Sequence, residues 1–370
     1  MDADLTGNGP PIERIEAAAY TVPTDGPESD GTFRWEATTL VLVLASAGGA
    51  TGIGYTYAHA AAVPLILETL APAVHGGDAL AVPAAWAAML SRVRNLGRPG
   101  LASAAISAVD VALWDLKARL LGLPLCDLLG RVRDGVPVYG SGGFTSYDDE
   151  RLAAQLGAWV EAGIDRVKMK VGRDPDADVA RVRRAREAIG PDAELFVDAN
   201  GAYHRKQAVA FAHDFADQGV TWFEEPVSSD DLDGLRLIRE VAPPGMEIAA
   251  GEYGYDAFAF RRLLEAGAVD VLQADATRCL GITGFMQAAA LCWAHHTPLS
   301  AHTAPALHLH PCAAAPTLRH LEYFHDHVRI ERMLFDGVVE PRRGVLYPDL
   351  ARPGLGLEFR RADAERYRVR

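Results

Sequence analysis

Eight short strand-like runs, separated by helical segments, occupy the chain after about residue 132, and this alternation limits the possible folds more than any other feature. The segments between them, such as 176–188 and 205–218, carry apolar residues at helical spacing. This pattern predicts an α/β fold containing a (β/α) barrel of the TIM type. The runs are Val136–Gly142, Arg166–Gly172, Glu194–Asn200, Val220–Pro226, Met246–Glu252, Ala268–Asp275, Thr297–Thr303 and Arg319–Phe324.

Seven consecutive runs have an ionisable residue at or near the C-terminal end. Successive members of this series are 28, 26, 28, 23, 27 and 20 residues apart, close to the roughly 30 residues of one βα unit. Because active sites of such barrels lie where the carboxyl ends of the strands meet, we expect these side chains to converge on one mouth. The seven residues are Lys170, Asp198, Glu224, Glu252, Asp275, His302 and Glu322.

Three carboxylates, Asp198, Glu224 and Glu252, follow one another in this series and come from three neighbouring strands. Without a cation they would repel one another in a partly dry mouth. An all-oxygen set of ligands favours Mg²⁺ over zinc or copper. We therefore predict a magnesium site formed by these three residues. The alternative is that they form surface ion pairs.

Two lysines, Lys168 and Lys170, precede the carboxylates on the neighbouring run. Residues two apart on a strand point to the same side, here the barrel interior. Lysines in that position are costly unless they face anions. Crowding by Lys168 and the cation is expected to lower the pKa of Lys170, so that Lys170 acts as a base. The alternative is a pair of solvated lysines at a strand end.

His302 and Asp275 end neighbouring runs across the mouth from Lys170. The carboxylate of Asp275 can orient the imidazole and raise its basicity, which predicts a catalytic dyad. A structural role for a lone histidine is the alternative. Glu322 ends the eighth run, and we expect it to stay protonated and to donate a hydrogen bond to a bound carboxylate.

Several short motifs resemble the enolase superfamily, mandelate racemase subgroup, over the span from about Ile15 to Leu357. The helical stretch 108–115 resembles that family's signature in its capping domain. The barrel motifs are Lys168-x-Lys170, Asp198-x-Asn200, Phe223-Glu224-Glu225-Pro226, Gly251-Glu252, Asp275 followed by Gly281-Ile282-Thr283-Gly284, and Ser300-Ala301-His302.

This resemblance implies a mechanism in which a lysine or histidine base removes the proton next to a carboxylate, and magnesium stabilises the resulting ene-diolate. It assigns the magnesium ligands as above and places Lys170 and the His302–Asp275 dyad on opposite faces of the substrate. Glu322 would be the electrophilic acid. Lys168 and Asn200 would contact the substrate or the developing enolate.

The N-terminal part reads as an α+β capping domain over residues 1–132. Two apolar runs, Thr38–Ala45 and Gly52–Tyr57, flank a glycine-containing turn and predict a hairpin, and Ala104–Leu120 predicts a helix. The polar stretch Thr24–Thr32 predicts a mobile loop. We expect the barrel to span 133–335, and a C-terminal segment, 336–370, to pack back on the capping domain.

The net charge of −13 over 370 residues argues against partners such as nucleic acid or an anionic membrane surface. The N-terminus has no basic start followed by an apolar run, and the four cysteines have no close pairing. We therefore expect a cytoplasmic enzyme, assembled as a homo-oligomer, that acts on a small-molecule carboxylate.

Side chains expected to cover the substrate include Tyr20, Trp35, Tyr57 and His59, together with Lys168 and Asn200. Most can form hydrogen bonds, which favours a polyhydroxy acid over an aryl acid. We therefore predict dehydration of a sugar acid to a 2-keto-3-deoxy acid. Racemisation or epimerisation of a 2-hydroxy acid by two bases is the alternative. A glycosidase or a non-catalytic sugar-acid binder fits the pattern less well.

Overall fold

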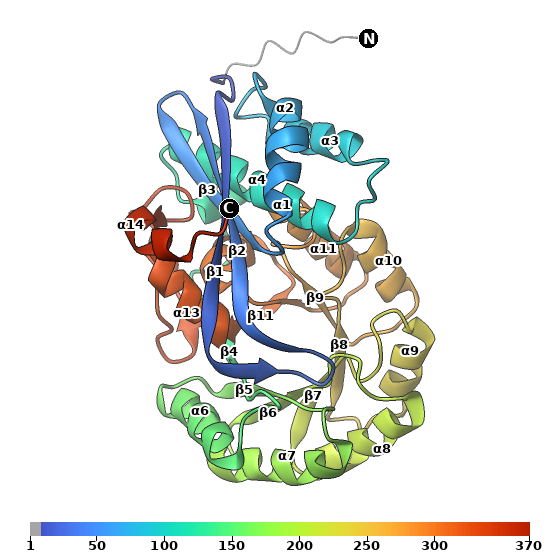
Figure 1. Cartoon of the computed structure of the whole chain (residues 1–370). Coiled ribbons are helices and arrows are strands. Elements are labelled where there is room, and N and C mark those ends of the chain that lie inside the picture. Colours follow the sequence, from blue (N-terminus) through green and yellow to red (C-terminus); the bar gives the residue numbers. More distant parts are fainter. Residues whose placement is uncertain (1–8) are drawn as a thin grey trace.

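A closed barrel of eight parallel strands forms the larger part of the protein, seen in the computed structural model, which describes residues 9–370. The strands pair in chain order, and β11 pairs with β4 to close the barrel (Figure 1). This confirms the predicted (β/α) barrel. The strands are β4 (Val136–Gly142), β5 (Arg166–Lys170), β6 (Glu194–Asp198), β7 (Val220–Glu224), β8 (Glu247–Ala250), β9 (Val271–Ala274), β10 (Leu299–Ala301) and β11 (Leu318–Phe324).

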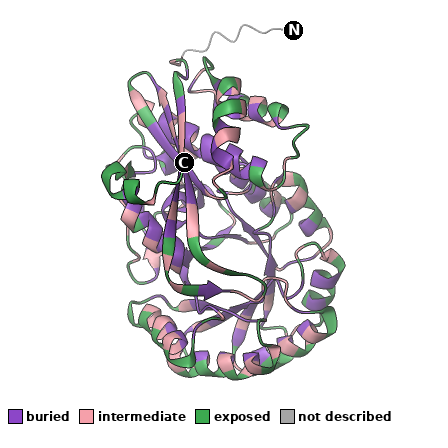
Figure 2. Cartoon of the chain, viewed as in Figure 1, coloured by how far each residue is buried: buried purple, intermediate pink, exposed green. Residues whose placement is uncertain are grey.

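The helices that follow the strands surround the barrel, and their exposed residues face outward in Figure 2. Three of them begin at an aspartate, Asp148, Asp231 or Asp256, whose side chain accepts a hydrogen bond from a backbone N–H of the first turn. These helices are α6 (Asp149–Glu161), α7 (Pro175–Ile189), α8 (Arg205–Ala216), α9 (Leu232–Val241), α10 (Ala257–Glu265), α11 (Gly281–Ala294), α12 (Pro305–Ala314) and α13 (His325–Leu334).

Several predicted strands end earlier in the structure than in the sequence interpretation. Gly172 and Asn200 have φ angles of 99° and 46°, which take the chain out of the extended conformation. Glu252, Asp275 and His302 likewise lie one or two residues beyond the ends of β8, β9 and β10. They stand on the connections at the mouth.

A three-stranded antiparallel sheet covers the mouth, formed by β1 (Arg14–Ser29), β2 (Arg34–Ala47) and β3 (Ala50–Tyr57). The predicted hairpin corresponds to β2 and β3. The predicted helix is α4 (Leu101–Leu120), which packs closely on β3 because a Cβ at Gly52 or Gly54 would lie 2.2 Å from a carbonyl oxygen of α4. The smaller elements around it are α1 (Ala62–Leu65), η1 (Ile66–Leu70), α2 (Ala71–Val74), α3 (Val82–Arg92) and α5 (Leu125–Leu129).

The prediction of a loop over Thr24–Thr32 is wrong for its first part, because β1 continues to Ser29 with an irregularity between Pro23 and Glu28. The C-terminal end of β1, the N-terminal end of β2 and the turn between them form an arm that reaches over the barrel (Figure 1). The arm is extended because the barrel holds it there. Ser29 Oγ lies 2.7 Å from Thr145 Oγ1, and Ser146 Oγ donates to the carbonyl of Pro27 over 2.6 Å.

The C-terminal segment contacts both parts of the molecule. Its strand β13 (Val345–Leu346) pairs with β4, and backbone hydrogen bonds of 2.9 Å join Ala19 of β1 to Val369 and Arg370. Its remaining elements are β12 (Phe335–Asp336), β14 (Glu358–Phe359), α14 (Arg361–Ala364) and η2 (Glu365–Tyr367). Within residues 9–370, no helix combines the length and the apolar character needed to cross a lipid bilayer.

Candidate active site

The three predicted metal ligands meet at the mouth of the barrel. Asp198 and Glu224 end neighbouring strands and are paired in register, and Glu252 follows β8. One oxygen from each carboxylate lies within 4.8 Å of the others, and all three side chains are buried. Glu252 Oε2 lies 3.2 Å from His302 Nε2 but accepts no well-aligned hydrogen bond from the described residues. Three buried carboxylates so close together form an all-oxygen donor set that fits a hard divalent cation.

Lys168 lies beneath this cluster and is fully buried. Its Nζ is 2.6 and 2.7 Å from the two carboxylate oxygens of Glu224 and 2.9 Å from Glu322 Oε1. Burial alone would lower the pKa of Lys168, but the surrounding carboxylates outweigh it and the pKa is raised well above its usual value. Lys168 is therefore a fixed positive charge between metal ligands and Glu322.

Lys170 pairs with Asp198 through a short contact to Oδ2. Burial opposes the charge on Lys170, yet the carboxylate of Asp198 prevails and raises the pKa of Lys170 above its ordinary value. The predicted lowering depends on a cation bound beside Lys170 and stays a prediction. It did not include the direct ion pair with Asp198.

His302 and Asp275 form the predicted pair, with Nδ1 and Oδ2 2.8 Å apart. The other ring nitrogen, Nε2, lies 3.2 Å from Glu252 Oε2 and 3.8 Å from Glu322 Oε2. Burial tends to lower the pKa of His302, but these carboxylates raise it to about 10. The imidazole therefore stands between its orienting carboxylate and the metal-ligand cluster.

The pKa of Glu322 is lowered in this arrangement, and its protonation beside a bound carboxylate stays a prediction. Burial favours its neutral form, but Lys168 at 2.9 Å prevails, and the pKa of Glu322 is lowered to about 2. Ser141 also donates a hydrogen bond to Glu322 Oε1. The sequence interpretation missed this lysine contact because it assigned Lys168 to the substrate.

A cavity of about 530 Å³ lies between the arm and the barrel mouth, and it contains four of the six residues predicted to bind substrate. Trp35, Tyr57 and His59 come from the capping sheet and the residues after it, and Asn200 from the barrel. Lys168 lies deeper, below the metal ligands. The structure thus places Trp35, Tyr57, His59 and Asn200 at the cavity and Lys168 outside it, and their contacts with substrate stay predictions.

Tyr20 is not at the mouth, so the prediction that it covers the substrate is wrong. Its ring is 2% exposed and packs 5.3 Å from the ring of Phe359, and its backbone bridges to Arg368. The C-terminal segment covers this part of β1. No local sequence signal relates Tyr20 to a segment more than 300 residues away.

Two further residues at the mouth were not predicted. Arg278 lies 3.1 Å from Glu252 Oε1 and 3.5 Å from Asp275 Oδ2, and so connects a metal ligand with the dyad. Its position three residues after Asp275, in the turn beyond β9, was the available signal. His327 lines the cavity and stacks on Tyr57 with ring centroids 3.4 Å apart.

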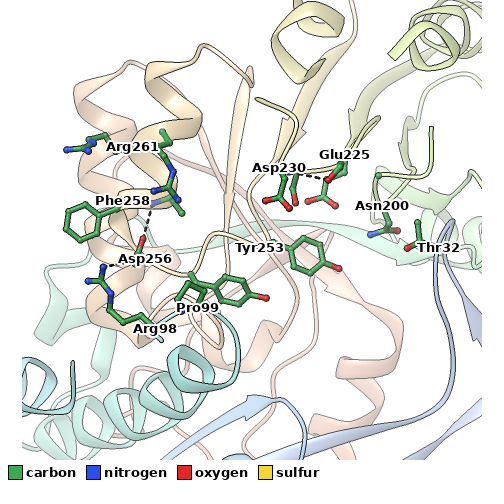
Figure 3. Close-up of a pocket in the computed structure, with 16 residues that line it drawn as sticks. Thr32, Arg98, Pro99, Asn200, Glu225, Asp230, Tyr253, Asp256, Phe258 and Arg261 are labelled. Carbon is green, nitrogen blue, oxygen red and sulfur yellow. Dashed lines mark hydrogen bonds and ion pairs between the residues drawn. The ribbon is translucent and has the colours of Figure 1, made fainter. Parts of the chain in front are cut away.

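A second, larger cavity of about 940 Å³ lies beside the mouth and shares Thr32, Asn200 and Tyr253 with the mouth cavity. In Figure 3, Tyr253 separates Asn200 and Thr32 from a group that includes Arg98, Asp256 and Phe258. None of the three clustered carboxylates lines this second cavity.

Comparisons with known proteins relate both parts of the chain to one family. Residues 26–130 match the N-terminal domain of mandelate racemase / muconate lactonizing enzyme, and residues 151–364 match the enolase C-terminal domain-like family. A mandelate racemase/muconate lactonizing enzyme-like protein from Rubrobacter xylanophilus has a crystal structure that superposes with a TM-score of 0.96. It is 56% identical over 97% of this chain and 100% of that chain.

The relatives of this chain include proteins with stated activities. The 3,6-anhydro-alpha-L-galactonate cycloisomerase of Streptomyces coelicolor is 33% identical over 95% of this chain and 98% of its own. The L-talarate/galactarate dehydratase of Salmonella typhimurium is 32% identical over 94% of this chain and 89% of its own. A crystal structure of the dehydratase, liganded with Mg and L-lyxarohydroxamate, has a TM-score of 0.90 at 28% identity, with 100% of this chain and 96% of that chain covered.

Proposed function

Since the chain belongs to the mandelate racemase/muconate lactonizing enzyme family of the enolase superfamily, we propose that it is a magnesium-dependent dehydratase of a sugar acid. The observation that carries the proposal is the buried cluster of Asp198, Glu224 and Glu252 between two candidate bases, Lys170 and His302. Similarity to a sugar-acid dehydratase and to a cycloisomerase of a sugar acid supports it.

Proton removal next to a carboxylate places a second negative charge on that group, and this charge must be stabilised in preorganised positions. Mg²⁺ held by Asp198, Glu224 and Glu252 would supply electrostatic stabilisation of this charge. Lys168, fixed between Glu224 and Glu322, contributes a second positive charge at the same end of the cavity. Asn200 lines the cavity and can donate a hydrogen bond to the substrate.

The two bases come from separate parts of the barrel wall. Lys170 ends β5, His302 follows β10, and the strands that carry the metal ligands, β6 to β8, lie between them along one side of the barrel. A substrate seated on the carboxylate cluster would have one base on each side. One base removes the proton from C2. Asp275 positions His302 to act either as that base or as a proton donor.

In the dehydration step, the C2–H and C3–O bonds break, and a double bond forms between C2 and C3. His302 would transfer a proton to the departing hydroxyl, which leaves as water. The enol product then gives a 2-keto-3-deoxy acid on tautomerisation. Proton transfer by a positioned side chain contributes about 10²–10⁴ to such a rate.

The experiment is a screen of sugar acids with Mg²⁺ present, in which a 2-keto-3-deoxy product is detected with a carbonyl reagent. We expect exhaustive chelation to abolish the product and added Mg²⁺ to restore it. A Glu224→Gln variant should lose activity while remaining folded. Full turnover by metal-free Glu224→Gln protein would contradict the proposal.

Racemisation or epimerisation is the second candidate, because two bases on opposite sides of the mouth also suit inversion at C2. Inversion of a good substrate without a keto product would favour it. The same screen in heavy water reports proton exchange at C2 for both reactions. Activity that persists after chelation would instead favour a glycosidase, and binding without turnover a sugar-acid binder. The cytoplasmic location and the homo-oligomer stay predictions.

A further inference from the structure

The charges in the mouth cavity are distributed unevenly between its barrel end and its arm end. Its three positively charged or protonatable groups at the barrel end are Lys170, Arg278 and His302, and each faces a carboxylate of the cluster or the dyad. These contacts define the end that would receive the reacting carboxylate of the substrate.

The arm end contains no lysine or arginine among the described residues that line the cavity. The cavity residues supplied by the arm and the capping sheet are Asp30, Thr32, Phe33, Trp35, Ala37, Thr38, Thr39, Tyr57, Ala58 and His59. Most of the polar groups among them are neutral donors or acceptors, which suit hydroxyl groups rather than an anion.

Two histidines, His59 and His327, also line the cavity near this end. His59 Nδ1 accepts a hydrogen bond from the backbone N–H of Ala61 over 3.1 Å, which leaves its Nε2–H as a donor. His327 is buried against Tyr57, and burial lowers the pKa of His327 well below its usual value. The ring of His327 therefore offers no positive charge to a second carboxylate.

Asp30 adds a negative charge to the arm end. Its Oδ1 accepts backbone hydrogen bonds from Thr32 and Phe33, both of 2.6 Å, so the carboxylate is held in place on the cavity wall. A fixed carboxylate repels an anionic group that approaches it, and specific sites use such repulsion to reject a competing ligand.

We propose that the substrate carries a single carboxylate, at the metal end, and a neutral hydroxylated chain at the arm end, so that it is an aldonic or anhydro-aldonic acid rather than an aldaric diacid. Asp30 is then a specificity-determining residue. This inference rests on the proposed function, because it needs the reacting carboxylate to occupy the cluster of Asp198, Glu224 and Glu252.

The three arginines of the second cavity, Arg98, Arg261 and Arg262, do not line the mouth cavity and so do not offset this charge distribution. Arg98 faces Asp256 at 3.7 Å, and Arg261 faces Glu265 at the same distance. Neither lines the mouth cavity, and Figure 3 places Arg98 on the far side of Tyr253 from Asn200.

The test compares pairs of acids that share a configuration and differ only in the terminal group, such as D-gluconate with D-glucarate and D-galactonate with galactarate. We expect kcat/KM to be at least tenfold higher for the monoacid of any pair that reacts. Equal or faster turnover of the diacid would overturn the inference while leaving the dehydratase proposal intact. Absence of turnover with every acid would instead count against the proposed function.

A variant isolates the contribution of Asp30. Asp30→Asn keeps the acceptor oxygen for Thr32 and Phe33 but removes the charge. In this variant we expect the kcat/KM of the monoacid, divided by that of the diacid, to fall about fivefold. This is the effect expected for loss of a like charge within roughly 10 Å in a partly solvated site. Glu36→Gln is the matched control, since Glu36 is an exposed carboxylate of β2 that does not line the cavity. An unchanged ratio in Asp30→Asn, or an equal change in both variants, would remove Asp30 from this role.

Discussion

Two tyrosines on one face of β3 allow a test of which side chains of the capping domain stabilise the fold and which bind the substrate. Tyr55 and Tyr57 are two residues apart, and their rings meet edge to face with centroids 5.9 Å apart. The hydroxyl of Tyr55 donates to Glu331 Oε1 over 2.6 Å. The hydroxyl of Tyr57 is buried without a partner among the described residues, and its side chain lines the mouth cavity.

The expected magnitudes follow from these different environments. Tyr55→Phe removes a buried hydrogen bond and leaves Glu331 with the backbone N–H of Ala306 at 3.1 Å as its remaining donor, which should reduce the free energy of unfolding by about 1–3 kcal/mol. Tyr57→Phe removes a buried hydroxyl that has no partner, so it should be neutral or stabilising by about 1 kcal/mol. If that hydroxyl binds the substrate, kcat/KM should fall by about tenfold to a hundredfold.

Urea unfolding midpoints and steady-state kinetics on the same preparations would measure both effects. The two variants serve as controls for each other, because each loses one hydroxyl from the same strand. We expect the stability loss in Tyr55→Phe and the kinetic loss in Tyr57→Phe. A Tyr57→Phe protein as unstable as Tyr55→Phe, with unchanged kcat/KM, would refute the reasoning.

Three further predictions concern buried charges. Lys168→Met should reduce the free energy of unfolding of the magnesium-free protein by about 3–5 kcal/mol in urea, because Glu224 and Glu322 lose their shared partner. Saturating Mg²⁺ should recover part of this loss, and equal losses with and without Mg²⁺ would contradict the prediction. Burial raises the pKa of Asp110 from 3.8 to about 7. The folded protein should therefore lose about 4 kcal/mol of stability as the pH rises from about 4 to 7. Urea midpoints across this range should fall more steeply for the unaltered protein than for Asp110→Asn, and parallel profiles would refute this prediction. Arg278→Gln should weaken Mg²⁺ binding about tenfold to a hundredfold in a calorimetric titration, since Arg278 orients Glu252, and unchanged binding would exclude that positioning role.

The barrel and its carboxylate cluster were predictable because both follow from short-range periodicity. Each strand and its helix form one local unit, so Asp198, Glu224 and Glu252 recur at the spacing of that unit. Parallel strands then bring their carboxyl ends together without further information. The same rule placed Lys170 and His302 at the mouth.

The arm, the position of Tyr20 and the ion pair of Glu322 were not predictable, because each depends on contacts between distant parts of the chain. β1 remains extended beyond Pro23 because the loop around Thr145 binds it. Glu322 pairs at 2.9 Å with Lys168, which lies more than 150 positions earlier in the sequence. Neither composition nor residue spacing indicates which residues far apart in the sequence come into contact.

This difference bears on how the enzyme could change its substrate without changing its chemistry. The charged groups that would move protons stand on the barrel, whereas the arm supplies much of the opposite wall of the cavity. Trp35 is fixed within the arm by its Nε1–H, which donates to Glu28 over 2.8 Å, and by edge-on packing against Phe144 of the barrel. Substitutions between residues 30 and 39 can therefore alter the shape and charge met by the far end of the acid, while the cluster that would bind its carboxylate stays as it is.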